Sequence, residues 1–456
     1  MNYFYFFFFL SLSAIILFKP FAKSISDWIV KSDNLNKTGL ITFFIGISLI
    51  SYSLMQSFWY ERMWMVVTLI LGILLLIRSL FILFFIEKIK KILPVFIGNY
   101  YKFTIPISIT MVFLAFLIVT TDYIGPQKDI SNCESDNQIQ VICKFNNSED
   151  IVITPDKEFL FMSQMGSIAP WGDNEPGSFA MMNLGTNKKI IPEIIMEKNT
   201  WGDESCLRTN SDGYGPHGID LVKRNDGRYQ IGVINHYPKE SVEMFELKRN
   251  DLDWVMVWRG CIDVPDKFYF NDLSLKKDGS FYASHMYKRG ITENEWLMIA
   301  LIKNNSGNIV FWKDSNFTEL LGSEGSSPNG LVLDEDSNNI YISYNLEDKI
   351  SIFDLTTNSR INSYYVESPD NPYIKDNSLW ITSLDFQPND AQDCIYKVNC
   401  SLPFSIHELD KETLEVKNKY IFSKTVFGLP TVAVPHNEKV YIGSFHADRL
   451  GSFSTN

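Results

Sequence analysis

The stretch NGLVLDEDSNNIYISYN, residues 329–345, contains two short apolar runs separated by the polar turn DEDSNN. Runs of branched and aromatic residues on either side of such a turn predict a β-hairpin. Five other segments repeat the order of a polar or small residue, a strand, a polar turn and a second strand. They are residues 149–163, 217–236, 271–285, 370–383 and 430–446.

Six antiparallel units of roughly 55 residues each predict an all-β six-bladed propeller. The innermost strands of propeller blades surround a central tunnel. The residues that open each first strand should therefore meet at one mouth of that tunnel. These residues are Glu149, Asp150, His217, Asn271, Asp272, Asn329, Asp370 and Asn371.

All of these residues except His217 carry oxygen donors. Carboxylate and amide oxygens that converge from several blades are the ligands that Ca²⁺ prefers. The alternative is that each Asn or Asp only opens a strand, a turn role that both residue types commonly fill. His217 lies in SDGYGPHGID (211–220), and His236 follows nineteen residues later in a chain with six histidines.

Charge divides the chain near residue 125. Residues 1–125 contain ten Lys or Arg and five Asp or Glu, whereas residues 126–456 contain 31 and 48, a net charge of −17. An acidic second half is a poor match for nucleic acid, which requires a basic surface. We expect residues 1–125, which contain long apolar segments, to be an all-α transmembrane region, and residues 126–456, which contain the six repeats, to be the propeller.

The first region has four apolar segments, of which the first is short and the other three each run to about twenty residues, enough to cross a membrane. They are residues 4–18, 39–58, 63–85 and 103–121. The first could instead be a signal peptide, but it lacks a basic start and a clear cleavage site, so a retained helix is favoured.

Two connections between these segments are rich in lysine, which predicts that both face the cytoplasm. They contain Lys19, Lys23, Lys31 and Lys37, and Lys88, Lys90, Lys91 and Lys102. The expected product is a multi-pass integral membrane protein that contacts lipid through its N-terminal helices. Its propeller should lie on the extracytoplasmic side, whether periplasmic, extracellular or lumenal.

All six cysteines lie in the second half, as expected for an exported domain with disulfides. The short spacings suggest the pairs Cys133–Cys143 and Cys394–Cys400, which leaves Cys206 and Cys261. Six cysteines allow fifteen pairings, so other connectivities stay open.

Residues 133–453 resemble the paraoxonase/arylesterase family, which are calcium-dependent six-bladed propeller lactonases, with the gluconolactonase (SMP-30-like) group as more distant relatives. The resemblance rests on SED, PHGI, VINHYPKESVEMFEL, FNDLSL, PNGLVLDEDSNNIYIS, DNPYI and YIGSFH, in that order. It implies two calcium ions. The catalytic ion would be held by Glu149, Asn271, Asn329, Asp370 and Asn371, and the structural ion by Asp150, Asp272 and the carbonyl of Ile219.

The resemblance also implies that His217 and His236 form a catalytic dyad that activates water above the calcium ion. The alternative is that His217 only donates a hydrogen bond near the ion. Asp376 and Asn377 offer a second Asp-Asn pair, but we expect them to form the hairpin turn before Trp380.

Two classes of function follow. The first is a membrane-tethered hydrolase of lactones or aryl esters, with a small-molecule substrate, and the second is a non-catalytic binding or sensor propeller with structural calcium only. The sequence favours the enzyme, because a binding module would need only the structural ligands. A gluconolactonase-type enzyme is disfavoured by the histidine pair.

Overall fold

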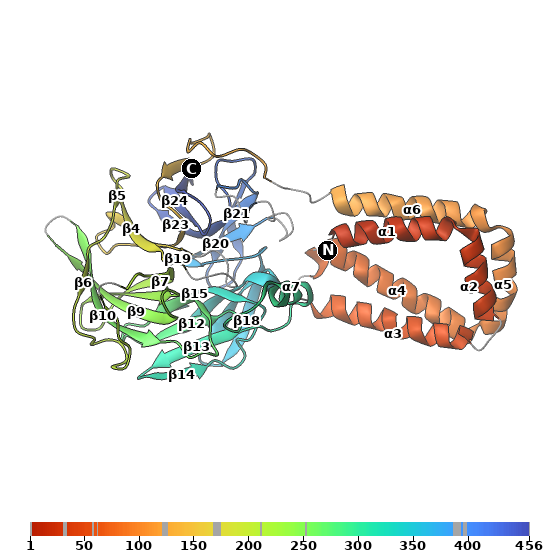
Figure 1. Ribbon diagram of the computed structural model, residues 1–456, viewed down its shortest axis with the longest axis horizontal. Coiled ribbons are helices and arrows are strands. Elements are labelled where there is room, and N and C mark those ends of the chain that lie inside the picture. The colour runs from red at the N-terminus through yellow and green to blue at the C-terminus, as the bar shows by residue number, and fades with distance from the viewer. Residues whose placement is uncertain are drawn as a thin grey trace. The chain divides into compact units, whose positions relative to one another are not determined.

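The computed structural model describes residues 2–30, 34–56, 59–61, 63–120, 126–166, 175–209, 212–250, 253–385, 394 and 399–455. Residues 57, 58 and 121 of the predicted helices, and residue 125 at the expected boundary, lie outside this set. The chain falls into two compact units, Met1–Tyr123 and Ile124–Asn456. Figure 1 colours the first red to orange and the second from orange to blue.

The described part of the first unit is helical. Its elements are α1 (Asn2–Leu17), α2 (Lys19–Val30), α3 (Asn34–Met55), the 3₁₀ turn η1 (Trp59–Glu61), α4 (Met63–Phe84), α5 (Ile86–Gly98) and α6 (Tyr100–Thr120). The four predicted apolar segments are the helices α1, α3, α4 and α6. Of these, α3, α4 and α6 are each long and apolar enough to cross a membrane, and α1 with α2 forms a fourth candidate span, bent by 82°.

The two lysine-rich connections, which we expected to be linkers, contain the helices α2 and α5. Both mix lysines with apolar residues at helical spacing, which explains why they are helical without being apolar throughout. They contact each other at one end of this unit, while α1 packs against α6 and α3 against α4.

The second unit is a six-bladed β-propeller, as predicted. Each blade is an antiparallel meander whose first strand lies at the tunnel. Blade 1 contains β2 (Ser148–Ile153), β3 (Phe159–Gln164), β4 (Ser178–Asn183) and β5 (Lys189–Ile190); blade 2 contains β7 (Pro216–Lys223), β8 (Tyr229–Asn235), β9 (Ser241–Arg249) and β10 (Trp254–Asp263), with β6 (Ile194–Met196) parallel to β10.

The remaining blades follow in chain order. Blade 3 contains β11 (Phe270–Leu275), β12 (Phe281–His285), β13 (Asn308–Lys313) and β14 (Asn316–Glu319); blade 4 contains β15 (Pro328–Asp334), β16 (Asn339–Tyr344), β17 (Lys349–Asp354) and β18 (Ser359–Tyr365); blade 5 contains β19 (Tyr373–Lys375), β20 (Ser378–Leu384), β21 (Phe404–Asp410) and β22 (Val416–Phe422); blade 6 contains β23 (Pro430–His436), β24 (Lys439–Ser444), β25 (Arg449–Ser454) and β1 (Gln140–Cys143). The turn η2 (Asn345–Glu347) connects β16 to β17.

Blade 6 closes the ring because its outer strand comes from the start of the unit. Strand β1 pairs antiparallel with β25, so that Gln140 lies opposite Ser452. The guanidinium of Arg449, which is fully buried, donates to the carbonyls of Ile130 and Asn132. Both ends of the propeller are therefore held by the same blade.

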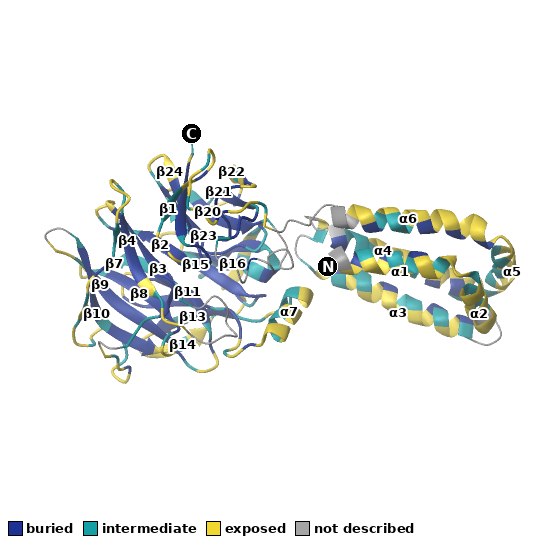
Figure 2. Cartoon of the chain, turned by 45° about the horizontal axis from the view of Figure 1, so that its top comes forward, coloured by how far each residue is buried: buried dark blue, intermediate teal, exposed yellow. Residues whose placement is uncertain are grey.

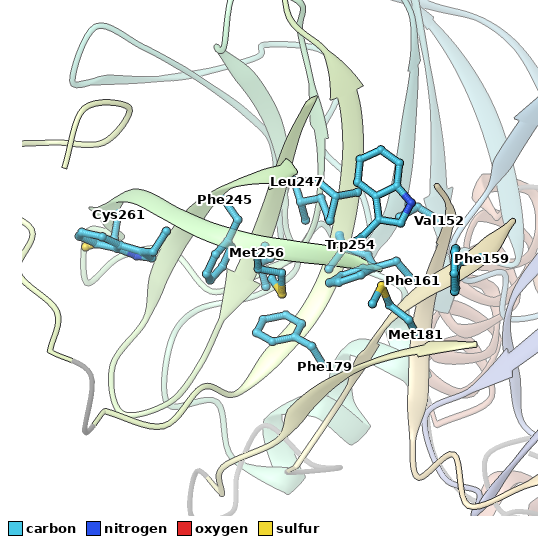
Figure 3. Close-up of a cluster of buried hydrophobic side chains, with 14 of the residues drawn as sticks. Val152, Phe159, Phe161, Phe179, Met181, Phe245, Leu247, Trp254, Met256 and Cys261 are labelled. Atoms are coloured by element: carbon cyan, nitrogen blue, oxygen red, sulfur yellow. The ribbon is translucent and has the colours of Figure 1, made fainter. Parts of the chain in front are cut away.

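Apolar side chains packed between neighbouring blades form the core. Figure 2 shows these buried residues in dark blue along the strands of the propeller. Figure 3 shows the cluster between blades 1 and 2, where Phe161 and Phe179 face Phe245 and Met256. Burying each such side chain stabilises the fold by about 1.5–3 kcal/mol.

Three disulfides connect the predicted cysteine pairs: Cys133–Cys143, Cys206–Cys261 and Cys394–Cys400. The helix α7 (Glu293–Ile302), between β12 and β13, was not predicted. It begins at a capping box, in which the side chain of Thr292 accepts from the amide of Glu295 and the Glu295 carboxylate accepts from the amide of Thr292. The Thr-x-x-Glu motif before an apolar run was the signal for it.

Candidate functional site

The candidate site lies where the first strands of the blades bulge toward the tunnel. In five blades the pairing of the first strand with the second shifts register at the same place, between Ser148 and Asp150, Pro216 and Ile219, Phe270 and Leu273, Pro328 and Leu331, and Pro430 and Ala433. The predicted residues Glu149, His217, Asn271 and Asn329 lie inside four of these bulges. A bulge removes residues from the ladder and redirects their side chains, so the backbone itself presents these groups to the tunnel.

Hydrogen bonds join these bulges across the tunnel. The amide nitrogen Nδ2 of Asn371, in blade 5, donates to Oε1 of Glu149, in blade 1, over 2.8 Å. The Glu149 carbonyl accepts from the hydroxyl of Thr431 in blade 6. The side chain of Asn329 hydrogen-bonds to Asp370. Residues separated by up to 282 positions in the sequence therefore share one site.

The five residues that the resemblance assigns to a catalytic ion share an unusual property. Each is buried and has one side-chain oxygen that accepts no hydrogen bond from any described residue. These atoms are Glu149 Oε2, Asn271 Oδ1, Asn329 Oδ1, Asp370 Oδ1 and Asn371 Oδ1. We call these five residues the ligand cup. Buried polar atoms rarely lack a partner, so five of them from four blades fit a cation-binding site.

The carboxylates of the tunnel lie close together in a buried space. Burial, and then the neighbouring carboxylates Asp370, Asp150 and Asp272, raise the pKa of Glu149 well above its usual range. Burial and the charge of Asp150 do the same to the pKa of Asp370. A bound cation or bound protons would relieve this repulsion. The described residues contain no group of three or more His, Cys, Asp or Glu side chains that could hold a metal ion. Three of the five cup oxygens belong to amides, which such a group does not include.

A second set of oxygens lies on the same strands. Asp150 accepts from the backbone amides of Ile151 and Ile219, both over 2.8 Å. Asp272 accepts from the amides of Leu273 over 2.7 Å and Leu331 over 2.8 Å. Burial raises the pKa of Asp150 to about 7 and that of Asp272 well above its usual range. Asp150, Asp272 and Ile219 all line the same cavity of the tunnel.

Two glycines allow the bulges to approach this closely. A Cβ atom on Gly330 would lie 2.5 Å from the Cα of Asn371, and one on Gly218 would lie 2.3 Å from Oδ1 of Asp272. Both glycines follow a predicted site residue, Asn329 and His217. Any side chain at either position would push neighbouring blades apart.

The two histidines form a hydrogen-bonded pair beside the ligand cup. Nδ1 of His217 lies 2.9 Å from Nε2 of His236. The other nitrogen of His217, Nε2, lies 3.6 Å from Oε1 of Glu149 and 3.4 Å from Nδ2 of Asn271. Burial, and then the proximity of His236, hold the pKa of His217 well below its usual range, so this ring is neutral at pH 7.

Two residues that hold the dyad were missed in the sequence. Oε2 of Glu240 lies 2.8 Å from Nδ1 of His236. Asn235, fully buried, accepts from the amide of Gly215 over 2.9 Å and donates to the carbonyls of Tyr237 and Lys239. In the sequence, the contact between Glu240 and His236 is indicated only by the acidic residue type four positions after the histidine. The ring of Tyr269 stacks on His236 at 4.7 Å.

A cavity of about 360 Å³ follows the first strands away from the ligand cup. Its walls include Asp150, Asp272 and Ile219 at one end and Asp334 and Lys277 at the other. Its lining includes one ligand-cup residue, Asn371, but not Glu149, Asn271, Asn329 or Asp370. The cavity therefore borders the cup at Asn371.

The second Asp-Asn pair lies outside the ligand cup. Asp376 and Asn377 connect β19 to β20 as the hairpin turn, as predicted, and Asn377 donates to Asp410. His285 ends β12, where its Nδ1 accepts from the amide of Tyr269 over 3.2 Å.

A family model described as arylesterase matches residues 146–450. No curated protein matches the chain. Among solved structures, a luciferin-regenerating enzyme is similar at 11% identity over 70% of this chain and 95% of its own, with a TM-score of 0.43.

Two further solved structures are similar. A putative glucose dehydrogenase-type oxidoreductase from Thermus thermophilus is 12% identical over 69% of this chain and 99% of its own, with a TM-score of 0.41. A putative gluconolactonase is 11% identical over 73% and 98%, with a TM-score of 0.38.

Proposed function

Because the chain belongs to the arylesterase family, we propose that its propeller is a calcium-dependent carboxylic-ester hydrolase that acts on aryl esters or lactones. The observation that carries this proposal is the set of five buried oxygens in the ligand cup that accept no hydrogen bond from the described residues. A propeller that only bound a partner through structural calcium would need Asp150, Asp272 and Ile219 but not these five.

The proposal is for two calcium ions. Ca²⁺ takes about six to eight oxygen ligands, commonly carboxylates and amide or backbone carbonyls. Glu149, Asn271, Asn329, Asp370 and Asn371 would hold the catalytic ion, and Asp150, Asp272 and the carbonyl of Ile219 the structural one. When bound, the catalytic ion supplies the positive charge that polarises the ester carbonyl and stabilises negative charge on its oxygen.

The histidine pair would supply the base. His217 is neutral, and its Nε2 faces the cup at 3.6 Å from Glu149, so it can take a proton from a water molecule that enters there. The water oxygen then bonds to the acyl carbon, the bond from that carbon to the alkoxy oxygen breaks, and the proton passes to the leaving oxygen. His236, at 2.9 Å from His217, orients the base.

The test uses the full-length protein in detergent, with phenyl acetate as the aryl ester and a panel of γ- and δ-lactones. Hydrolysis should require calcium and should stop when a chelator is added. Asn271→Ala should abolish turnover, and His217→Ala should lower kcat by about 10²–10⁴-fold, the usual contribution of general-base catalysis. Asp376→Asn, in the hairpin turn outside the tunnel, is the matched control.

Activity that ignores chelator, or full activity in Asn271→Ala, would show that the cup is not the catalytic metal site. A folded, calcium-loaded protein that hydrolyses none of these substrates would favour the binding or sensor propeller instead.

We further propose that α1, α3, α4 and α6 anchor the protein in a membrane with the propeller on the extracytoplasmic side. The apolar length of these helices and the lysines of α2 and α5 support this arrangement. Protease added to intact cells or spheroplasts should then cleave the propeller, and protease added to inverted vesicles should not.

A further inference from the structure

We propose that Glu240 is a positioning residue that fixes the proton positions of the histidine dyad, so that the unprotonated Nε2 of His217 faces the ligand cup. This inference rests on the proposed function, because it says which atom of the dyad acts as base and what makes it one.

The geometry forms a continuous chain. Glu240 Oε2 lies 2.8 Å from His236 Nδ1, and His236 Nε2 lies 2.9 Å from His217 Nδ1. His217 Nε2 then faces Asn271 Nδ2 at 3.4 Å. The side chains of Glu240 and His236 are each 8% exposed, so water competes little for their hydrogen bond.

The direction of each hydrogen bond follows from chemistry. The carboxylate oxygen of Glu240 accepts from Nδ1–H of His236, and in a ring that carries one proton Nε2 is then an acceptor. His217 Nδ1 must then donate to that acceptor, which leaves the lone pair on Nε2 of His217. The side-chain nitrogen of Asn271 is a donor and faces this lone pair, while Asn271 Oδ1 stays available to a metal ion.

Asn235 explains why Glu240 reaches His236 across a short loop. Its Nδ2 contacts the carbonyl of Tyr237 at 2.8 Å and that of Lys239 at 3.1 Å, and its Oδ1 accepts from Gly215, two residues before His217. The same amide therefore holds the loop between His236 and Glu240 and the turn that leads to His217. Tyr269, stacked on His236 at 4.7 Å, fixes the plane of that ring.

Without the Glu240 carboxylate, His236 could carry its proton on Nε2 instead. Its Nε2–H would then face His217 Nδ1, and His217 would carry its own proton on Nε2, where it cannot accept another. The base would be lost, although neither histidine was changed. A comparable loss follows when the carboxylate behind a catalytic histidine is replaced by an amide in serine proteases.

The experiment compares wild type with Glu240→Gln, Glu240→Asp and Glu240→Ala in the full-length protein, with Glu204→Gln as the matched control. Glu204 is an exposed glutamate in the connection before β7. Two quantities are measured: kcat and KM on phenyl acetate, and the tautomers of His217 and His236 from long-range ¹H–¹⁵N spectra of ¹⁵N-histidine-labelled protein.

We expect Glu240→Gln to lower kcat at least about tenfold with KM nearly unchanged, since general-base catalysis contributes about 10²–10⁴-fold. The spectra should show Nδ1–H on both histidines in wild type and a changed tautomer in Glu240→Gln. Glu240→Asp should restore part of kcat. Formate, a free carboxylate, should do the same for Glu240→Ala, which tests the idea even if the glutamine variant fails to fold.

Unchanged kcat and unchanged tautomers in a folded Glu240→Gln would overturn the inference while leaving the proposed function intact. If wild type hydrolyses none of the substrates, the proposed function fails, and the spectra still decide whether Glu240 sets the tautomers. A purely structural role would lower stability in Glu240→Ala without any rescue by formate, which would also overturn the inference.

Discussion

Removing calcium from the full-length protein should lower its melting temperature more at pH 8 than at pH 5. The reason lies in Asp150, whose pKa burial raises to about 7 in the ion-free protein, against 3.8 for an ordinary aspartate. The folded state therefore keeps a proton that the unfolded state loses as the pH rises from 3.8 to 7. Ion-free stability must fall through that window.

The size of the effect follows from the two pKa values. From pH 5 to about pH 7, Asp150 holds a proton in the ion-free folded state but not in the unfolded state. The free energy of unfolding therefore falls by 1.36 kcal/mol for each of these two pH units, or by about 3 kcal/mol. In the proposed sites bound calcium would take the place of this proton, so Asp150 alone should make the calcium-dependent gain in stability about 3 kcal/mol larger at pH 8. At about 2 °C for each kcal/mol, this contribution is about 6 °C. Glu149, Asp272 and Asp370, whose pKa values burial also raises, should add to it.

The assay is thermal unfolding followed by tryptophan fluorescence, with calcium or with chelator, at both pH values. Comparing the calcium effect within each pH cancels groups that do not contact the ions, such as His407, whose pKa burial lowers to about 3. Asp150→Asn should reduce the pH difference by about 3 kcal/mol, and Asp376→Asn should keep it. A calcium effect that is absent, or that is equal at both pH values, would refute the reasoning.

Three further outcomes are expected. Gly330→Ala should weaken calcium binding and lower stability by about 1–3 kcal/mol, because its Cβ would lie 2.5 Å from the Cα of Asn371. Gly185→Ala should change neither, because its Cβ would come no closer than 3.4 Å to a neighbour. Calcium titration and thermal melting of both variants check these outcomes. Replacing Cys206 and Cys261 by serine should destabilise the propeller by about 4 kcal/mol, and replacing Cys394 and Cys400 by serine should destabilise it by about 2 kcal/mol. The first pair is separated by 55 residues in the sequence and the second by only 6, so the first disulfide closes the longer loop. Equal losses of stability in chemical denaturation would contradict this ranking. Changing Lys88, Lys90 and Lys91 to glutamine should raise the fraction of chains whose propeller is protected from protease added to intact cells, since these lysines carry the orientation signal of α5.

Local patterns predicted most of the propeller. Alternating apolar residues and polar turns, as in NGLVLDEDSNNIYISYN, specify a hairpin wherever they occur, because the pleat and the turn depend on a few adjacent residues. Six such pairs correspond to the first two strands of six blades. The helix α7 was not predicted because its sequence has a capping box but no amphipathic pattern.

Long-range geometry decided what the sequence could not express. The spacing of the repeats predicted Glu149, Asn271 and Asn329 as residues of one tunnel mouth. The cup oxygens, which accept no hydrogen bond from the described residues, come together only once the blades close into a ring. The lysine-rich connections contain helices, α2 and α5, that we did not predict. The carboxylate of Glu240 contacts His236 through a loop whose sequence has no periodicity.

The sequence alone therefore determined the strands, the turns, the apolar helices and the residue types available at the tunnel, since each depends on neighbours along the chain. Only the tertiary structure decided which side-chain oxygens meet in the cup, which nitrogen of His217 faces the cup, and which carboxylates share one buried space. These depend on contacts between residues up to 282 positions apart, and such contacts exist only when the ring is complete.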